Sequence, residues 1–147
     1  MITNGRTYIL ECLGHMDGGN RFLDGGTKNN KVVLSPSTVP RQYPGAEWEA
    51  IWHEGDRWQF KCLATEVDFY LNGLTESGRV DLSKNPENTG TYWNVERQAP
   101  GLYHLTCLNT LGGKTHLNGD TVENTVDLRD STKDLSGTNW RFYEYVD

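Results

Sequence analysis

Acid and amide side chains recur at a nearly constant spacing along the chain, each followed by glycine. The positions are Asp24, Asn72 and Asn118. Asp81 and Asp127 follow the two asparagines after nine residues in each case. Carboxylate and amide groups can hold a pair of vicinal hydroxyls through matched acceptor and donor atoms. The five residues therefore indicate a site for a polyhydroxylated ligand.

The same residue pairs are also typical of turns. Asp-Gly and Asn-Gly tolerate the positive φ angles that tight hairpins require. We therefore expect Asp24, Asn72 and Asn118 to form the turns of three hairpins. Asn72 and Asp81 should face outward, where a ligand can reach them. Val33 takes the corresponding place in the first hairpin, so the second and third hairpins are the better candidates for a site.

The cysteines and histidines do not form the pattern of a catalytic or metal site. The cysteines lack Cys-x-x-Cys spacing, and their period places them on inward strand faces as small buried residues. The histidines lack the spacing of metal ligands. His116 takes the place of Phe22 and Tyr70, which indicates a structural role, and His104 lies on an outer strand face. We therefore predict no enzymatic activity, metal or cofactor. The residues concerned are Cys12, Cys62, Cys107, His15, His53, His104 and His116.

One motif occurs three times in the chain. Each cysteine is followed by leucine, and the cysteines are separated by steps of 50 and 45 residues. The leucine before Asp24, Asn72 and Asn118 recurs with steps of 48 and 46 residues, and a tryptophan with steps of 45 and 47. Landmarks that keep one order predict a single domain over residues 1–147, with repeats at approximately 6–54, 55–99 and 100–147. The tryptophans are Trp48, Trp93 and Trp140.

Each repeat divides into four extended segments. In the first segment of the first repeat, Tyr8, Leu10 and Cys12 share one face, and this alternation predicts a strand with one buried side. The hairpin supplies two strands, and the fourth carries the repeated tryptophan, which we expect in the core together with Trp52. Three four-stranded repeats predict an all-β protein of the β-trefoil class, a closed six-stranded barrel with pseudo-threefold symmetry and a cap of three hairpins.

The charge and the apolar pattern exclude several classes of partner. The net charge is −6 and the pI is near 5.2, and the sequence has no basic stripe of the kind that binds phosphate groups, so nucleic acid is excluded. No apolar run approaches the ~20 residues that a membrane span needs. The first ten residues, MITNGRTYIL, do not resemble a secretory signal. We therefore expect a cytoplasmic protein.

The arrangement resembles the ricin-type carbohydrate-binding modules and the small fungal β-trefoil lectins over essentially the whole chain. In ricin-type modules a carboxylate on the second strand binds two sugar hydroxyls, and a polar residue on the third strand assists. The resemblance places these roles on Asp24, Asn72 and Asn118, and on Asp81 and Asp127. Two positions depart from the family pattern. The stacking aromatic is replaced by Ser35, Ser83 and Arg129, and the glutamine of the Gln-x-Trp signature by Ala46, Thr91 and Thr138.

These observations predict a lectin with up to three shallow sites for glycans or glycoproteins. Tyr92, beside Trp93, is the aromatic candidate for a sugar contact. Tyr43, Tyr143 and Tyr145 are further aromatics without partners in the other repeats. The segments FLDGG and YLNG add a resemblance to intracellular mushroom trefoils similar to the light subunit associated with mushroom tyrosinase.

Two alternatives of other classes stay open. The chain could be a trefoil protease inhibitor that acts through the loop at residues 35–45, which three prolines stiffen and which carries Arg41. It could also be a noncatalytic interaction subunit of an enzyme complex, with a protein partner as its ligand. A lectin should use equivalent positions in several repeats, whereas an inhibitor should use one unique loop.

Overall fold

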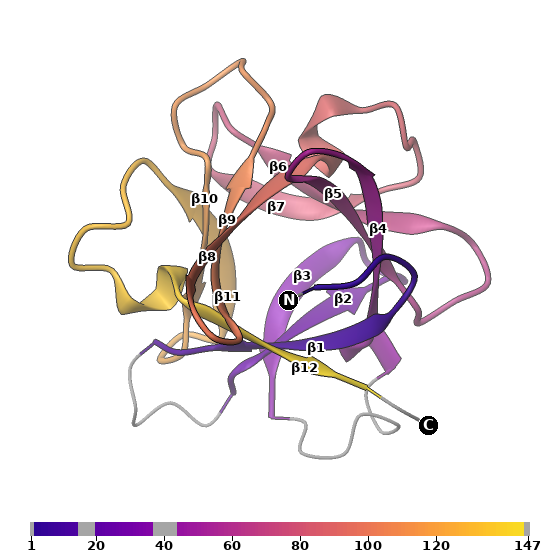
Figure 1. Cartoon of the computed structure of the whole chain (residues 1–147), viewed down its shortest axis with the longest axis horizontal. Helices are drawn as coiled ribbons and strands as arrows, with labels where there is room; N and C mark the ends of the chain where they lie inside the picture. Colours follow the sequence, from indigo (N-terminus) through magenta and orange to yellow (C-terminus); the bar gives the residue numbers. More distant parts are fainter. Residues whose placement is uncertain (1, 15–19, 37–43, 146–147) are drawn as a thin grey trace.

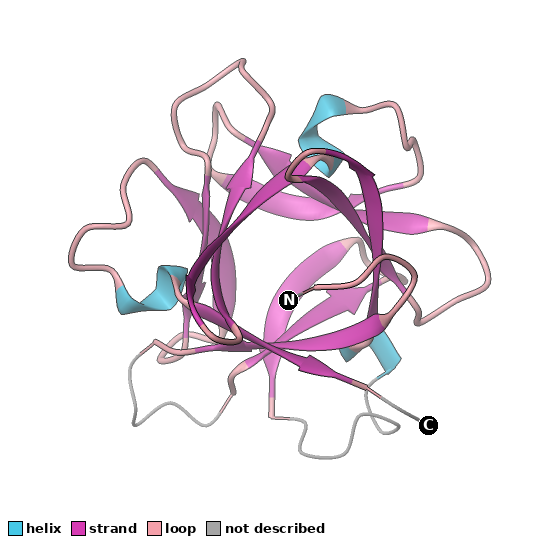
Figure 2. Ribbon diagram, viewed as in Figure 1, coloured by secondary structure: helices cyan, strands magenta, loops and turns pink. Residues whose placement is uncertain are grey.

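The chain folds into β-strands that short turns connect. The computed structural model describes residues 2–14, 20–36 and 44–145. Within these ranges it contains twelve strands and three short 3-10 helices, and Figure 2 shows how strands dominate. The all-β class predicted from the sequence is confirmed. Each described helix spans three residues, so none of them could cross a bilayer.

Six strands form a closed ring around the centre of the molecule (Figure 1). β1 pairs with β4 and β12, β5 pairs with β4 and β8, and β9 pairs with β8 and β12, all antiparallel. Because these pairings return to their starting strand, each strand of the ring has two neighbours. The strands are β1 (Thr7–Cys12), β4 (Trp48–Glu54), β5 (Arg57–Cys62), β8 (Trp93–Ala99), β9 (Leu102–Cys107) and β12 (Trp140–Glu144).

The other six strands form three hairpins. β11 also pairs with β3 and with β7, so the hairpins are joined to one another as well as to the ring. A single-turn helix follows each hairpin and leads into a ring strand. The hairpins are β2 (Phe22–Gly26) with β3 (Lys31–Ser35), β6 (Phe69–Leu74) with β7 (Arg79–Ser83), and β10 (His116–Asp120) with β11 (Thr125–Arg129); the helices are η2 (Pro44–Ala46), η3 (Thr89–Thr91) and η4 (Ser136–Thr138).

The hairpins turn three to six residues later than the sequence predicted. Asp24, Asn72 and Asn118 lie inside strands β2, β6 and β10, and the turns occupy residues 27–30, 75–78 and 121–124. The positive φ angles fall at the ends of these turns, at 55° for Asn30, 81° for Gly78 and 64° for Asn124. The prediction that the Asp-Gly and Asn-Gly pairs form the turns is therefore wrong.

A glycine is required in each of these strands because a thiol lies against it. A Cβ atom placed on Gly73 would lie 2.8 Å from Cys107 Sγ, and one on Gly119 would lie 2.6 Å from Cys12 Sγ. Gly25 has the same relation to Cys62, at 2.9 Å. Real Cβ atoms do not approach sulfur so closely, so the strand accepts only glycine here.

The cysteines join neighbouring repeats, and all three are free and buried, as predicted. The Cys107 thiol of the third repeat donates to Gly90 O at 3.5 Å in the second repeat. The Cys12 thiol donates to Gly137 O at 3.5 Å, and the Cys62 thiol to Gly45 O at 3.7 Å. Each thiol of a ring strand therefore donates to the glycine of a 3-10 helix that belongs to another repeat.

The repeated tryptophans are core residues, as predicted. Trp48, Trp93 and Trp140 are fully buried. Each indole Nε1–H donates to the leucine carbonyl before the Asp or Asn position, at 2.9 Å for Leu23, 3.0 Å for Leu71 and 3.0 Å for Leu117. The indole thus ties the fourth strand of a repeat to its own hairpin.

Trp52 is not a core residue, and its placement beside Trp48 in the core was wrong. Its side chain is 47% exposed. β4 pairs with β1 only at Trp48 and Glu49, so the rest of β4 and its turn into β5 extend beyond the ring. Trp52 lies in this extension opposite Trp58, where no other described strand covers it.

Candidate functional site

The second hairpin holds an amide and a carboxylate side by side. Asn72 and Asp81 are direct cross-strand partners, and Asn72 Nδ2 donates to Asp81 Oδ1 at 2.7 Å. Asp81 is partly exposed, whereas Asn72 is only 3% exposed. The prediction that both side chains face outward is therefore confirmed for Asp81 and wrong for Asn72. The buried amide orients the carboxylate that a ligand can reach.

The other end of the Asn72 amide faces the helix η3. A Cβ atom on Gly90 would overlap Asn72 Oδ1, so glycine makes room for the amide at this position. No donor among the described residues reaches this buried oxygen. The amide is therefore fixed by packing on one side and by Asp81 on the other, and the carboxylate is held in one orientation.

The third hairpin repeats this pair and adds a guanidinium group. Asn118 Nδ2 donates to Asp127 Oδ1 at 2.9 Å, and Asn118 is 5% exposed. Arg129 Nε donates to both carboxylate oxygens of Asp127 at 3.2 and 3.1 Å, and its Nη2 lies 3.1 Å from Oδ2. The third site therefore presents a neutralised carboxylate with an arginine, whereas the second presents Asp81 beside Ser83.

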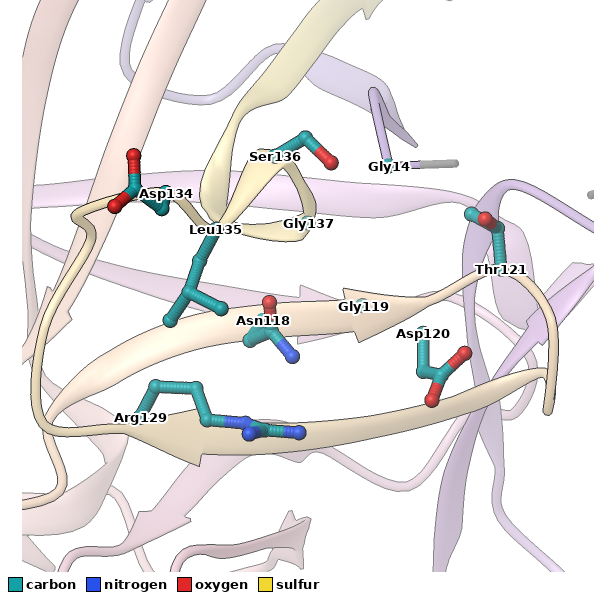
Figure 3. Close-up of a pocket in the computed structure, with 10 residues that line it drawn as sticks. All are labelled: Gly14, Asn118, Gly119, Asp120, Thr121, Arg129, Asp134, Leu135, Ser136 and Gly137. Carbon is teal, nitrogen blue, oxygen red and sulfur yellow. The ribbon is translucent and has the colours of Figure 1, made fainter. Parts of the chain in front are cut away.

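A small cavity of about 200 Å³ opens over the third hairpin (Figure 3). In Figure 3 the Asn118 side chain lies between Arg129 on the neighbouring strand and the segment from Leu135 to Gly137. Asp120 and Asp134 also line the cavity, so acceptors and donors surround its floor. The shape and the polar lining suit a small polyhydroxylated group.

The first hairpin lacks the amide–carboxylate pair. Asp24 is opposite Val33, so no polar partner stands across the strand. Burial raises the pKa of the Asp24 carboxyl. The carboxylate packs toward Gly45 as Asn72 packs toward Gly90. The first hairpin thus keeps the shape of the other two but not their polar pair.

Tyr92 belongs to a different cluster. Its ring lies edge-on to His53 at 5.0 Å, and the Arg57 guanidinium lies 4.1 Å above it. His53 Nε2 is 2.8 Å from Gln59 Oε1, which connects the cluster to the ring strand β5. The structure therefore gathers Asn72 with Asp81, and Asn118 with Asp127, and it places Tyr92 against other residues.

Burial shifts the pKa values of the three thiols and of His116. Burial raises the pKa of the Cys12 and Cys62 thiols to about 11 and raises that of Cys107, so none of them is a thiolate nucleophile at neutral pH. Burial, followed by the charge of His104, lowers the pKa of His116, whose Nδ1 lies 3.3 Å from Thr106 Oγ1. Among the described residues no group of three potential ligands could hold a metal ion.

Several sequence candidates have other outcomes. Tyr43, Arg41 and most of the proposed inhibitor loop, at residues 37–43, lie outside the described residues. Tyr143 is exposed and donates to Glu11 Oε1 at 3.0 Å. Ser35, at the position of the expected stacking aromatic, is buried. No described hairpin carries an aromatic side chain at that position.

Sequence reasoning did not single out Asp120, at the end of β10, or Asp134, shortly before η4. Both residues line the cavity. Asp134 has a positive φ of 59°, which asparagine and aspartate adopt more readily than other side chains. The sequence signal that could have indicated this contribution was an aspartate shortly before the Ser136–Gly137 pair.

Comparisons with known proteins identify the fold. No protein-family model and no curated protein matches the chain. Among solved structures, the designed threefold-symmetric protein ThreeFoil has a TM-score of 0.75 at 15% identity, with 95% of this chain and 99% of that chain covered. The chain has a β-trefoil fold.

Two natural proteins share this trefoil. SeviL, solved with the asialo-GM1 saccharide, has a TM-score of 0.69 at 13% identity over 97% of this chain and 100% of its own. An endo-β-galactosidase from Clostridium perfringens has a TM-score of 0.74 at 15% identity over 96% of this chain. This chain spans 33% of the galactosidase chain. At such identities the likeness establishes the fold, whereas a function has to be argued from the site.

Proposed function

We propose that this trefoil is a non-enzymatic carbohydrate-binding protein built from three repeats, with sites on the second and third hairpins. Asp81 and Asp127 accept hydrogen bonds from sugar hydroxyls, and Asn72 and Asn118 hold the two carboxylates in place. SeviL, a trefoil of matching length, was solved with a saccharide, which supports this class of ligand.

The observation that carries the proposal is the buried amide behind a half-exposed carboxylate. In both hairpins the amide–carboxylate hydrogen bond is short, at 2.7 and 2.9 Å. A carboxylate fixed in this way can accept from two vicinal hydroxyls without first losing conformational entropy. Turn formation does not explain the pair, because the residues lie inside strands.

The two sites should differ in the sugars that they accept. Among the described residues no guanidinium group pairs with Asp81 as Arg129 pairs with Asp127, so the second site offers a charged acceptor to hydroxyl groups. At the third site Arg129 adds donors beside Asp127, which suits a sugar with an additional acceptor. We expect glycans that bind both sites to share a vicinal diol and to differ in their ranking between the sites.

A glycan array followed by substitution of the two aspartates tests the proposal. Asp81→Asn keeps an oxygen that can accept from Asn72 but removes the charge, as Asp127→Asn does in the third hairpin. We expect each substitution to weaken binding about tenfold or more, since charge-assisted hydrogen bonds contribute about 1.5–3 kcal/mol each. Binding is measured by titration calorimetry with the glycans identified on the array.

Glu66→Ala is the matched control because Glu66 is an exposed carboxylate outside both hairpins. It should leave glycan binding unchanged. Absence of binding to every glycan class on the array would refute the lectin assignment. Full affinity in the Asp81→Asn/Asp127→Asn double variant would refute the location of the sites but not the activity.

The same protein sample distinguishes the alternatives. A protease inhibitor should inhibit trypsin-like or cysteine proteases at micromolar concentration, and an interaction subunit should bind a protein whose glycans have been removed. The proposal expects neither result. A cytoplasmic location remains part of the proposal, to be checked by fractionation.

A further inference from the structure

A second and larger cavity lies away from the hairpins, beside the turn that joins β4 to β5. Its volume is about 690 Å³, within the range of about 300–1,000 Å³ that is usual for ligand sites. Trp52, Trp58 and Tyr103 form its aromatic side. Neither Asp81 nor Asp127, the hairpin carboxylates, lines this second cavity.

Trp52 is an exposed aromatic ring that the backbone holds in place. Its indole Nε1–H donates to Gly55 O at 2.7 Å, and its backbone N–H donates to Asn4 Oδ1 at 2.8 Å. The repeat spacing puts Arg97 and Glu144 at the corresponding positions. The ring is therefore a fixed platform that occurs once in the trefoil, and neither the core nor the symmetry of the fold explains it.

Polar groups of both kinds line the same cavity as this platform. Asp56 and Glu96 provide acceptors, and Asn94 and Arg97 provide donors. Val95 N donates to Asp56 O at 3.3 Å, so the turn that carries Asp56 is fixed to strand β8. The polar side and the aromatic side therefore belong to one rigid unit of paired strands.

The combination of aromatic, acidic and basic side chains in this cavity favours one class of ligand. A wholly apolar molecule would bury Asp56 and Glu96 without partners, which is costly. A ligand with a single charge would meet a like charge, because carboxylates and the Arg97 guanidinium line the same cavity. A neutral sugar ring has an apolar C–H face for Trp52 and hydroxyls for the polar side.

We propose that this cavity is a further carbohydrate site, which binds a neutral oligosaccharide with one ring stacked on Trp52. The site supplies the aromatic platform that the hairpins lack at Ser35, Ser83 and Arg129. Its volume exceeds that of the third hairpin's cavity more than threefold, which favours two or more sugar rings. The inference rests on the proposed carbohydrate-binding function but not on the hairpin sites.

Indole N–H resonances provide a direct test with internal controls. The protein, labelled with ¹⁵N, is titrated with lactose, cellobiose, chitobiose and maltose, and Trp52→Phe assigns the Trp52 signal. The indoles of Trp48, Trp93 and Trp140 donate to buried carbonyls, so they should stay in place. We expect the Trp52 signal to shift saturably with at least one disaccharide. Toluene serves as the apolar aromatic comparison.

Two variants separate this site from the hairpins. Trp52→Ala should weaken disaccharide binding about tenfold, the size of effect expected for loss of about 1.4 kcal/mol, and Trp52→Phe should retain part of the affinity. The Asp81→Asn/Asp127→Asn variant should leave the Trp52 shift intact. Thermal unfolding of each variant verifies that the fold survives.

The outcomes are distinct. Binding that survives Trp52→Ala and is lost in the double hairpin variant would overturn this inference and leave the proposed function standing. A Trp52 signal that moves with toluene and with no disaccharide would overturn the ligand class. If no disaccharide binds to the unmodified protein, the inference fails, and the glycan array decides whether the hairpin function fails with it.

Discussion

Asp24 stands where the other two hairpins have asparagine, and burial penalises its charge by raising the carboxyl pKa. Asparagine has the same shape and no charge. Because Val33 offers no donor or acceptor across the strand, the carboxylate has no cross-strand partner to offset the lost hydration. Asp24 in place of asparagine should therefore lower the free energy of unfolding at neutral pH by a measurable amount.

We expect Asp24→Asn to stabilise the protein at neutral pH. A raised pKa in the folded state means that the penalty is absent below the unfolded pKa of about 3.9, where both states are protonated. The penalty grows as the pH rises through the folded pKa and is complete above it. Thermal unfolding should show a higher Tm for the variant at pH 7 and equal values near pH 3.

The reverse exchange provides the comparison. Asn72→Asp should destabilise at pH 7, because it removes the donor to Asp81 and places two carboxylates within hydrogen-bond distance. If Asp24→Asn raised the Tm equally at both pH values, charge would not be the cause.

At this scale the sequence assigned Asn72 with Asp81, and Asn118 with Asp127, to common sites, but it did not predict which of them is buried. Their cross-strand pairing was also not predicted, because the turns were expected at Asn72-Gly73 and Asn118-Gly119. Burial of the amides depends on η3 and η4, whose contact with the hairpins no local pattern reveals. The partners of Tyr92 come from β4 and β5, and they too are set by packing between elements that are distant in the sequence.

At the scale of elements, the ring strands were predictable because their buried faces alternate, whereas the hairpin turns were not. Gly25, Gly73 and Gly119 suggested turns, yet they serve close approach by a sulfur atom from another repeat. A sequence does not distinguish a glycine that is required because another atom lies close to it from a glycine that is required for a positive φ angle. The sequence placed Trp52 in the core because it alternates with Trp48. Alternation of apolar and polar residues does not show how far a strand extends beyond the ring.

Gly73→Ala tests the packing of thiol against strand. The added Cβ would lie 2.8 Å from Cys107 Sγ and 3.1 Å from Leu128 Cδ1, so we expect a loss of about 1–3 kcal/mol in the free energy of unfolding. Part of the loss should disappear in Gly73→Ala/Cys107→Ala, with a coupling of about 1 kcal/mol. Urea unfolding of the four proteins measures both quantities.

Gly113→Ala is the control for this cycle. A Cβ atom at Gly113 would meet nothing within 4 Å, so the free energy of unfolding should change little or rise slightly. Additivity of the Gly73 and Cys107 substitutions to within about 0.5 kcal/mol would show that the thiol does not set the space at Gly73.

At the scale of the whole molecule, the reactivity of the three buried thiols measures whether the contacts between repeats open. Each thiol bonds to a glycine carbonyl in another repeat, so no repeat can open without breaking such a contact. With the pKa of Cys12 and Cys62 near 11, we expect no reaction of the folded protein with a thiol reagent at pH 8. Unfolding in denaturant should release all three thiols.

Mass spectrometry of alkylated peptides then compares the three sites under native conditions. Equal, slow alkylation of Cys12, Cys62 and Cys107 is expected, because their exposure requires global unfolding. Rapid alkylation of one cysteine alone would show that one repeat opens independently.

The pairing of β1 with β12 closes the ring at a junction that is built like two others. β4 meets β5, and β8 meets β9, in the same antiparallel manner, and Gly55 and Gly101 make the covalent connections with φ angles of 52° and 76°. The first and last described strands meet without such a turn. Since all three junctions are antiparallel strand pairs, we expect circular permutation at either glycine turn to leave the set of strand pairings unchanged.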